Sequence, residues 1–207
     1  MARNRTLTKA DFVEVATNYV DENGLNALTM RVLGDLLGVD ATACYRHFRS
    51  KGALLAAMVD ALFLAILDAA PDSGSPRERL EAQMLASRRE MVAHPQLAAA
   101  IAVSEGDTPA ALELMKSAIA NLEAMGLSGA NLVQGYQTIE SYAIGSSIFD
   151  LSRAPHNMEI RRARYRLLEN PAFDVAAKTV QSTREVTEDA YKIGMHALIN
   201  HVETLAD

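Results

Sequence analysis

Residues 29–51 read Thr-Met-Arg-Val-Leu-Gly-Asp-Leu-Leu-Gly-Val-Asp-Ala-Thr-Ala-Cys-Tyr-Arg-His-Phe-Arg-Ser-Lys. The pattern predicts two short helices around a turn at 38–40, followed by the start of a third helix. Thr29 and Asp40 are residue types that cap helix N-termini. Gly38 tolerates the backbone of a tight turn, and Gly34 lets the next helix approach closely. The stretch therefore predicts a helix-turn-helix.

The segments on either side of this stretch also predict helices. Thr8 is an N-cap for a first helix, with Asp11 in the first turn, and Gly24 is a natural stop. Ser50 caps a fourth, long helix, in which apolar residues recur at helical spacing as far as Ala70. The N-terminal unit is thus expected to have three helices, followed by a long connecting helix.

The remainder of the chain also lacks a strand pattern. Hydrophobic residues make up 49% and aromatic residues 5% of the 207 residues, which suits an Ala- and Leu-rich helical core. We expect an all-α fold, with a helix-turn-helix domain at 1–50 and a second helical domain at 51–207. The expected later helices are 76–93, 95–103, 109–125, 129–152 and 184–205, with a polar stretch at 153–183 that can contain short helical pieces.

Composition also bears on the compartment. No uncharged run of about 18 apolar residues appears, so no membrane span or membrane partner is expected. The basic N-terminus is not followed by the apolar region of a secretory signal. Cys44 is the only cysteine, which fits a reducing, cytoplasmic setting. We interpret it as a small core residue, with a redox switch as the alternative.

The charge distribution is more informative than the net charge of −6. Residues 1–60 carry seven basic and seven acidic side chains, so the whole net charge belongs to 61–207. The basic residues cluster at 3–9 and 46–51, and no acid occurs from Ala41 to Val59. This local positive patch favours contact with nucleic acid. Arg3, Arg5 and Lys9 fit either a DNA-touching arm or a basic tail.

The second helix of the predicted unit carries groups that can read DNA. In a helix-turn-helix, the N-terminal residues of this helix meet base edges in the major groove. Alanines at 41 and 43 can touch a thymine methyl group, and Thr42 can hydrogen-bond a base. Arg46, one turn later, can reach either guanine or a phosphate.

These residues resemble the tetracycline-repressor (TetR/AcrR) family of one-component regulators over about residues 8–60. The resemblance is carried by Leu28-Thr29-Met30-Arg31, Leu36-Leu37-Gly38-Val39, Tyr45-Arg46-His47-Phe48 and Ser50-Lys51-Gly52-Ala53-Leu54-Leu55. It implies a homodimer with a DNA-binding domain at 1–50 and a domain for ligand binding and dimerisation at 51–207. It further implies phosphate contacts and base contacts, the former from Thr29, Tyr45, His47 and Lys51 and the latter from Arg31, Ala41, Thr42 and Ala43. Two departures are Gly34, where the family usually has alanine, and Cys44, where a larger apolar residue is common.

Two late helices contain small residues that would allow close helix packing between subunits. The alternative is that the same stripes pack within one chain. The residues predicted for the dimer interface are Gly135, Tyr142, Ser146, Phe149, Tyr191, Gly194 and Leu198.

A ligand cavity is expected from recurring methionines, whose flexible thioethers line adaptable apolar sites but also fill ordinary cores. Glu140 is either an anchor for a cationic or hydroxylated ligand or a solvated acid. The predicted cavity residues are Met84, Met91, Met115, Tyr136, Gln137 and Glu140. A basic run is interpreted as a solvated face, with an anionic ligand as the alternative; it comprises Arg161, Arg162, Arg164 and Arg166.

Catalytic motifs are not found. The five histidines form no HExxH pattern, and there is no nucleophile elbow, phosphate loop or GxGxxG. We therefore expect no enzyme, no metal and no cofactor. The predicted function is a ligand-responsive repressor that binds palindromic operator DNA as a homodimer and is released by a small-molecule effector. The alternative is a helical small-molecule carrier without a DNA function.

Overall fold

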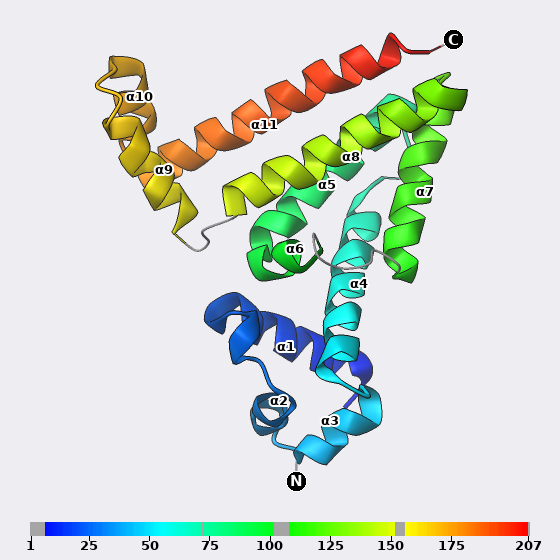
Figure 1. Cartoon of the computed structure of the whole chain (residues 1–207), viewed down its shortest axis with the longest axis vertical. Helices are drawn as coiled ribbons and strands as arrows, with labels where there is room; N and C mark the ends of the chain where they lie inside the picture. The colour runs from blue at the N-terminus through cyan, green and yellow to red at the C-terminus, as the bar shows by residue number, and fades with distance from the viewer. Residues whose placement is uncertain (1–6, 72, 102–107, 152–155, 207) are drawn as a thin grey trace.

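The computed structural model describes residues 7–71, 73–101, 108–151 and 156–206, with the side chains of 148–151 left out. This described part is built of helices and turns and has no strand (Figure 1), so the all-α expectation is confirmed. The elements are α1 (Lys9–Asn23), the 3₁₀ turn η1 (Leu25–Ala27), α2 (Met30–Leu37), α3 (Ala41–His47), α4 (Lys51–Ala69), α5 (Pro76–Ala93), α6 (Pro95–Ile101), α7 (Pro109–Ala124), α8 (Gly129–Leu151), α9 (Asn157–Arg166), α10 (Pro171–Ala176) and α11 (Val180–Glu203).

The first four α-helices begin where their capping residues predict. The side chains of Thr8, Thr29, Asp40 and Ser50 each accept a hydrogen bond from a backbone N–H in the first turn that follows. Such caps satisfy donors that a helix N-terminus leaves unpaired. Gly38 closes α2 in the left-handed region, with φ of 67°. Local chemistry therefore fixes the bounds of the helix-turn-helix.

Gly34 sets the distance between α2 and α3. A Cβ at this position would lie 2.8 Å from the carbonyl oxygen of Val39 and 3.2 Å from the backbone nitrogen of Ala41. The absence of a side chain therefore lets the turn fold back closely onto α2. Cys44, on the inner face of α3, is fully buried, and burial raises the pKa of its thiol. This confirms Cys44 as a core residue.

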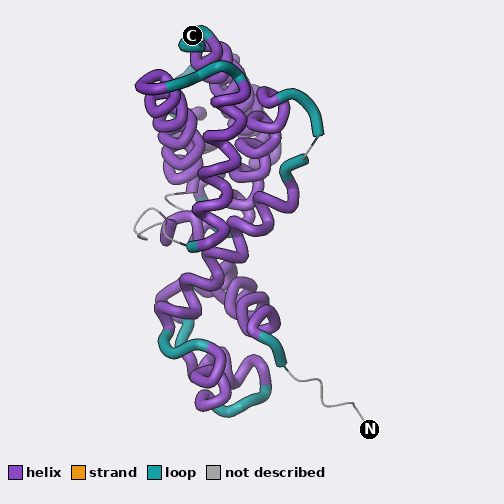
Figure 2. Tube along the Cα trace, turned by 90° about the vertical axis from the view of Figure 1, so that its right-hand side faces the viewer, coloured by secondary structure: helices purple, strands orange, loops and turns teal. Residues whose placement is uncertain are grey.

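The molecule is elongated, with α1 to α3 at one end and the later helices at the other (Figures 1 and 2). α4 runs between them and contributes to the core on both sides. One apolar cluster extends without a break from Phe12 and Leu33, through Met58 and Ile66 of α4, to Leu97 of α6. Because the core is continuous, α4 is a rigid structural link. A domain boundary at 50/51 remains a prediction.

By length and composition, α4 is the helix in the described part of the chain that could cross a membrane. Core helices of soluble proteins pass the same test. Leu54, Met58 and Ile66 are buried within this fold. Asp60 of α4 accepts a hydrogen bond from the backbone N–H of Ala110, with its Oδ1 2.9 Å away. These contacts give α4 the role of a core helix here.

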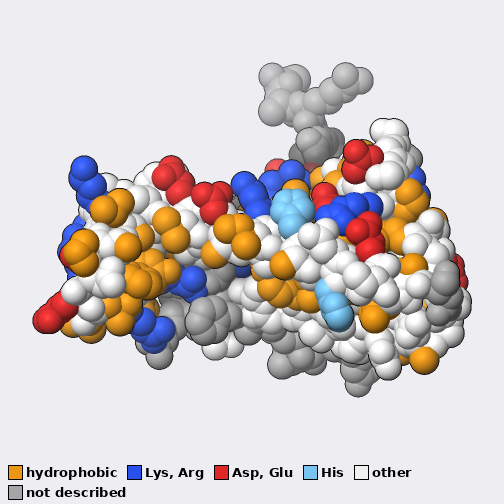
Figure 3. Space-filling view, turned by 90° about the horizontal axis from the view of Figure 1, so that it is seen from above, with side chains coloured by type: hydrophobic (Ala, Val, Ile, Leu, Met, Phe, Trp, Pro, Cys, Tyr) orange, Lys and Arg blue, Asp and Glu red, His pale blue; other side chains and the backbone are white. Residues whose placement is uncertain are grey.

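A second core lies between α5, α7, α8 and α11. α8 and α11 run antiparallel, because Asn131 reaches the carbonyl of Leu205 near one end and Tyr142 reaches the carbonyl of Tyr191 further along. α9 and α10 form a hairpin against the start of α11 (Figure 1). Hydrophobic side chains gather on that end of the molecule, with basic ones among them (Figure 3).

The polar stretch expected at 153–183 has short helical segments in its described part. It contains α9 and α10, and α11 begins at Val180 rather than at 184. The earlier start has a local cause, because Thr179 and Ser182 form a capping box. The Thr179 side chain accepts the backbone N–H of Ser182, and the Ser182 side chain accepts the backbone N–H of Thr179. The helix expected at 95–103 is described as far as Ile101, and its last two residues lie outside the described part.

Candidate DNA-binding surface and ligand cavity

The predicted DNA-contacting residues lie together at the α2–α3 end of the molecule (Figure 1). Those of α3 are spaced along a helix whose N-terminal turn is free of bulky side chains. Tyr45 is 54% exposed, so its ring and hydroxyl stand free of the core. Thr29, Arg31, Thr42 and Arg46 are exposed, whereas Ala41, Ala43, His47 and Lys51 are partly buried.

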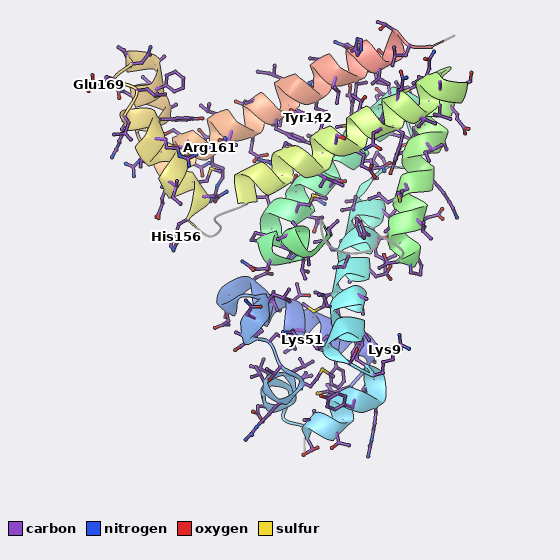
Figure 4. All side chains as sticks on the ribbon, in the orientation of Figure 1. Lys9, Lys51, Tyr142, His156, Arg161 and Glu169 are labelled. Atoms are coloured by element: carbon purple, nitrogen blue, oxygen red, sulfur yellow. The ribbon has the colours of Figure 1, made fainter. Side chains whose placement is uncertain are left out.

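Lys51 is held in place within the chain. Its Nζ donates a hydrogen bond to the carbonyl oxygen of Leu25, 2.9 Å away, from the first turn of α4 (Figure 4). A lysine ammonium has three N–H donors, so this bond leaves two for other acceptors. The contact fixes a positive charge beside the N-terminus of α4, where the helix dipole also favours an anion.

Two other side chains of the surface are fixed by neighbours. The His47 ring packs on Phe12, with ring centroids 4.5 Å apart. Asp40 receives the backbone N–H of Thr42 at 2.8 Å, and hydrogen bonds from the side chain and backbone of Thr42 lower the pKa of Asp40. The backbone contact makes Asp40 the N-cap of α3.

A cavity of about 310 Å³ lies between α4, α5, α6, α7 and α8. It is lined by five of the six residues predicted for a ligand site: Met84, Met91, Met115, Tyr136 and Glu140. Gln137 is not in the lining; it is exposed, and its amide donates to the Oε2 of Glu140 at 3.2 Å. The lining residues absent from the prediction are Phe63, Leu80, Gln83, Ser87, Ile101, Ala111, Leu114, Ala118, Ile139, Ala143 and Ile144.

The polar groups of this cavity are few and mostly paired. Tyr136 donates its hydroxyl to the Oε1 of Glu140, 2.7 Å away. Burial, followed by this hydrogen bond, raises the pKa of Tyr136, which therefore remains a neutral donor. Gln83 donates its amide to the carbonyl of Leu114 at 2.9 Å. An apolar wall with few fixed polar groups is the usual composition of a small-molecule site.

The residues predicted for the dimer interface lie mainly inside the chain. Gly135 and Tyr191 are buried, and Leu198 packs partly buried against the second core. Ser146 donates its hydroxyl to the carbonyl of Tyr142. The side chain of Phe149 lies outside the described residues. These contacts lie within one chain, and a role of the same residues between two subunits stays a prediction.

Tyr142 of α8 contacts two other residues that were predicted for the interface, Tyr191 and Gly194 of α11 (Figure 4). Its hydroxyl donates to the carbonyl of Tyr191 at 2.8 Å, and the two rings stack with centroids 5.3 Å apart. Gly194 leaves the space that Tyr142 occupies, since a Cβ there would overlap the Tyr142 hydroxyl. The small residue therefore serves packing between α8 and α11 of one chain.

Gly194→Ala is expected to destabilise the protein. The added methyl group must displace Tyr142 from its hydrogen bond and its stacked position, at a cost of about 1–3 kcal/mol for overpacking. Thermal unfolding should shift downward by roughly 2–10 °C for a chain of this size. Gly52→Ala is the matched control, because its Cβ would meet only the Ser50 hydroxyl at an ordinary 3.6 Å. Equal melting temperatures for the two variants would contradict the packing role.

A buried ion pair joins the helices around Tyr191, and sequence reasoning missed it. Arg88 of α5 is 3% exposed, and its Nη2 lies 2.8 Å from the Oε1 of Glu188 on α11. The Arg88 guanidinium also lies over the Tyr191 ring, 5.0 Å from the centroid. No local signal marks this arginine, because its partner is 100 residues away in the chain.

Part of the basic run on α9 makes hydrogen bonds within the fold. Arg162 donates to the carbonyls of Ala177 and Lys178, at 2.9 and 3.1 Å, and so ties α9 to the segment that precedes α11. Arg161 approaches the Thr187 hydroxyl at 3.5 Å. Arg164 and Arg166 are exposed, as expected for a solvated face. In the described part of the chain, no group of three or more potential metal ligands comes together.

The arrangement defines a class of protein: a helix-turn-helix unit joined by a rigid helix to a helical domain with an apolar cavity. Two family models match the chain, one for bacterial regulatory proteins of the tetR family over residues 12–58 and one for the tetracycline-repressor-like C-terminal domain over residues 69–205. The chain belongs to the tetracycline-repressor family.

Individual relatives agree with this assignment. The HTH-type transcriptional repressor Rv1353c of Mycobacterium tuberculosis is 30% identical over 155 residues, which is 72% of this chain and 59% of that protein. The chain likewise spans 59% of the length of other curated relatives at about this identity.

Solved structures show the same fold. The transcriptional regulator SCO7222, a TetR from Streptomyces coelicolor, superposes with a TM-score of 0.78 at 22% identity, covering 98% of this chain and 100% of that one. ActR of Streptomyces coelicolor, solved in complex with (S)-DNPA, gives a TM-score of 0.69 at 19% identity, with 98% and 100% covered.

Proposed function

We propose that this protein is a cytoplasmic, ligand-responsive transcriptional repressor that binds operator DNA as a homodimer. The observation that carries the proposal is the surface of α3: Tyr45 and Arg46 project from a helix with a small-residue N-terminal turn, beside the fixed ammonium of Lys51. A helix of this shape fits a major groove, and the flanking polar groups suit phosphates. The relative Rv1353c is named a transcriptional repressor, which supports repression rather than activation.

The homodimer is proposed to form through the outer face of α8 and α11. On α11 an exposed row of Val186, Ala190, Ile193 and Ala197 follows helical spacing. On the neighbouring face of α8, small and polar residues such as Ser141 and Gly145 are exposed. Two such helix pairs can pack as a four-helix interface around a two-fold axis. This face lies beside the residues that were predicted from the sequence for the interface.

Ligand and DNA are proposed to be coupled through α4 and the α5–α6 junction. Phe63 of α4 lines the cavity, and the same helix begins at Lys51. His94, at the end of α5, lies with its Nδ1 2.7 Å from the Oδ2 of Asp21 on α1. A ligand that favours another packing of these helices would change the placement of α3, and DNA affinity would fall by the ligand's differential affinity for the two arrangements.

Lys51→Met is expected to weaken DNA binding at every sequence and to reduce the salt dependence. Removing one phosphate contact should lower the slope of log affinity against log salt by about one per subunit. The measurement is fluorescence anisotropy of a labelled duplex, selected by the wild-type protein from random-sequence DNA, over a salt series.

Lys116→Met is the matched control for this experiment. Lys116 is exposed on α7, away from α3, and its replacement changes the net charge by the same amount. An unchanged slope for Lys51→Met, or the same loss for Lys116→Met, would show that Lys51 holds no phosphate. A carrier without a DNA function would bind ligands but show no preference for a selected duplex.

A further inference from the structure

Glu140 is unusual among the residues around the cavity. Among the described lining residues it is the one that carries a charge. It receives hydrogen bonds from Tyr136 and Gln137, both neutral donors on its own helix. No ion pair joins Glu140 to a basic residue within the described part of the chain. Among the described residues, the cavity therefore presents a carboxylate without a balancing cation.

A partly buried carboxylate next to an apolar wall disfavours some ligands and favours others. An anionic ligand would bring like charges together, whereas a cation would offset the cost of removing the carboxylate from water. The Tyr136 ring beside Glu140 adds a π-face that attracts a cation. The three methionines and Phe63 provide polarisable and aromatic contacts for a flat apolar body.

We infer that the cavity takes an amphiphilic amine: an apolar, partly aromatic body with one protonated nitrogen that pairs with Glu140. The inference rests on the proposed ligand role of this cavity and adds the chemical class of the effector. The ammonium would approach Oε2, which accepts the longer bond of 3.2 Å from the exposed Gln137 amide, since the Tyr136 hydroxyl holds Oε1 at 2.7 Å. Anionic effectors are excluded as preferred ligands by the same charge.

The test uses three probes of matched size that differ in charge: 1-naphthylmethylamine, 1-naphthylmethanol and 1-naphthoate. Isothermal titration calorimetry without DNA measures their affinities for the wild-type protein. The amine should bind about tenfold more tightly than the alcohol, as expected for one charge-assisted hydrogen bond at a partly exposed site. Naphthoate should bind most weakly.

Two variants assign the preference to Glu140. Glu140→Gln keeps the shape and can still accept the Tyr136 hydroxyl, and it should bring the amine and the alcohol to equal affinity. Glu123→Gln, exposed on α7, makes the same change in net charge and should retain the tenfold preference. Circular dichroism and thermal unfolding confirm that both variants are folded.

The outcomes separate this inference from the proposed function. A preference for the amine that survives in Glu140→Gln would overturn the inference, as would equal or tighter binding of the alcohol or naphthoate to the wild-type protein. Failure of all three probes to bind would overturn both the inference and the ligand role of the cavity. DNA binding is measured separately, so its success or failure bears on the helix-turn-helix alone.

Discussion

Ile193→Glu is expected to produce a monomer and to weaken binding to a palindromic duplex by at least about a hundredfold, because two linked half-site contacts become one. Ile193 is 71% exposed at the middle of the apolar row on α11, so the change leaves the fold of one subunit intact. In a two-fold interface each glutamate would be buried against apolar surface without a partner, which is strongly unfavourable.

Sedimentation equilibrium gives the mass of the variant, and anisotropy with the selected duplex gives its affinity. Leu112→Glu is the matched control: Leu112 is 45% exposed on α7, away from the outer face of α8 and α11. That variant should remain dimeric and bind DNA normally. A dimeric Ile193→Glu protein with wild-type affinity would show that the subunits do not associate through this face.

Glu188→Gln is expected to lower the stability of the protein by about 2 kcal/mol, because it removes the charge of the Glu188 carboxylate from the buried Arg88 guanidinium. Removing one partner of a fully buried pair costs more, but the Glu188 side chain is 34% exposed and solvent screens part of the effect. The expected decrease in melting temperature is roughly 4–8 °C.

Differential scanning calorimetry of Glu188→Gln and Glu185→Gln checks this expectation. Glu185 is exposed one turn earlier on α11, where the same substitution should change the melting temperature by about a degree or less. If the two variants melt together, Arg88 is compensated by other contacts, and the ion pair with Glu188 contributes little to stability.

The helix-turn-helix was predictable because its determinants are local. Thr8, Thr29, Asp40 and Ser50 each act on a backbone N–H only two or three residues away. Gly38 adopts its left-handed conformation within the same short stretch. Short-range chemistry of this kind can be read from residue types and their spacing.

The C-terminal contacts were less predictable because they join distant parts of the chain. The spacing of methionines indicates a helix face but not its neighbours, and only the structure places Met84, Met91 and Met115 around one cavity. Gly194 indicates close helix packing, whether between subunits or within one chain. The position of Tyr142 shows close packing of α8 on α11 within one chain. In the sequence, Arg88 has the residue type of an exposed position, and only the structure shows its ion pair with Glu188 of α11.

Recognition of a DNA sequence by the α3 end of the protein is the central proposal. It is tested most directly by the affinity of the wild-type protein for the selected duplex and for a scrambled duplex of the same composition, across a salt series. We expect the selected duplex to bind about a thousandfold more tightly near physiological salt, and both affinities to fall steeply as salt rises. Equal affinity for the two duplexes, or no binding to either at low salt, would contradict the claim.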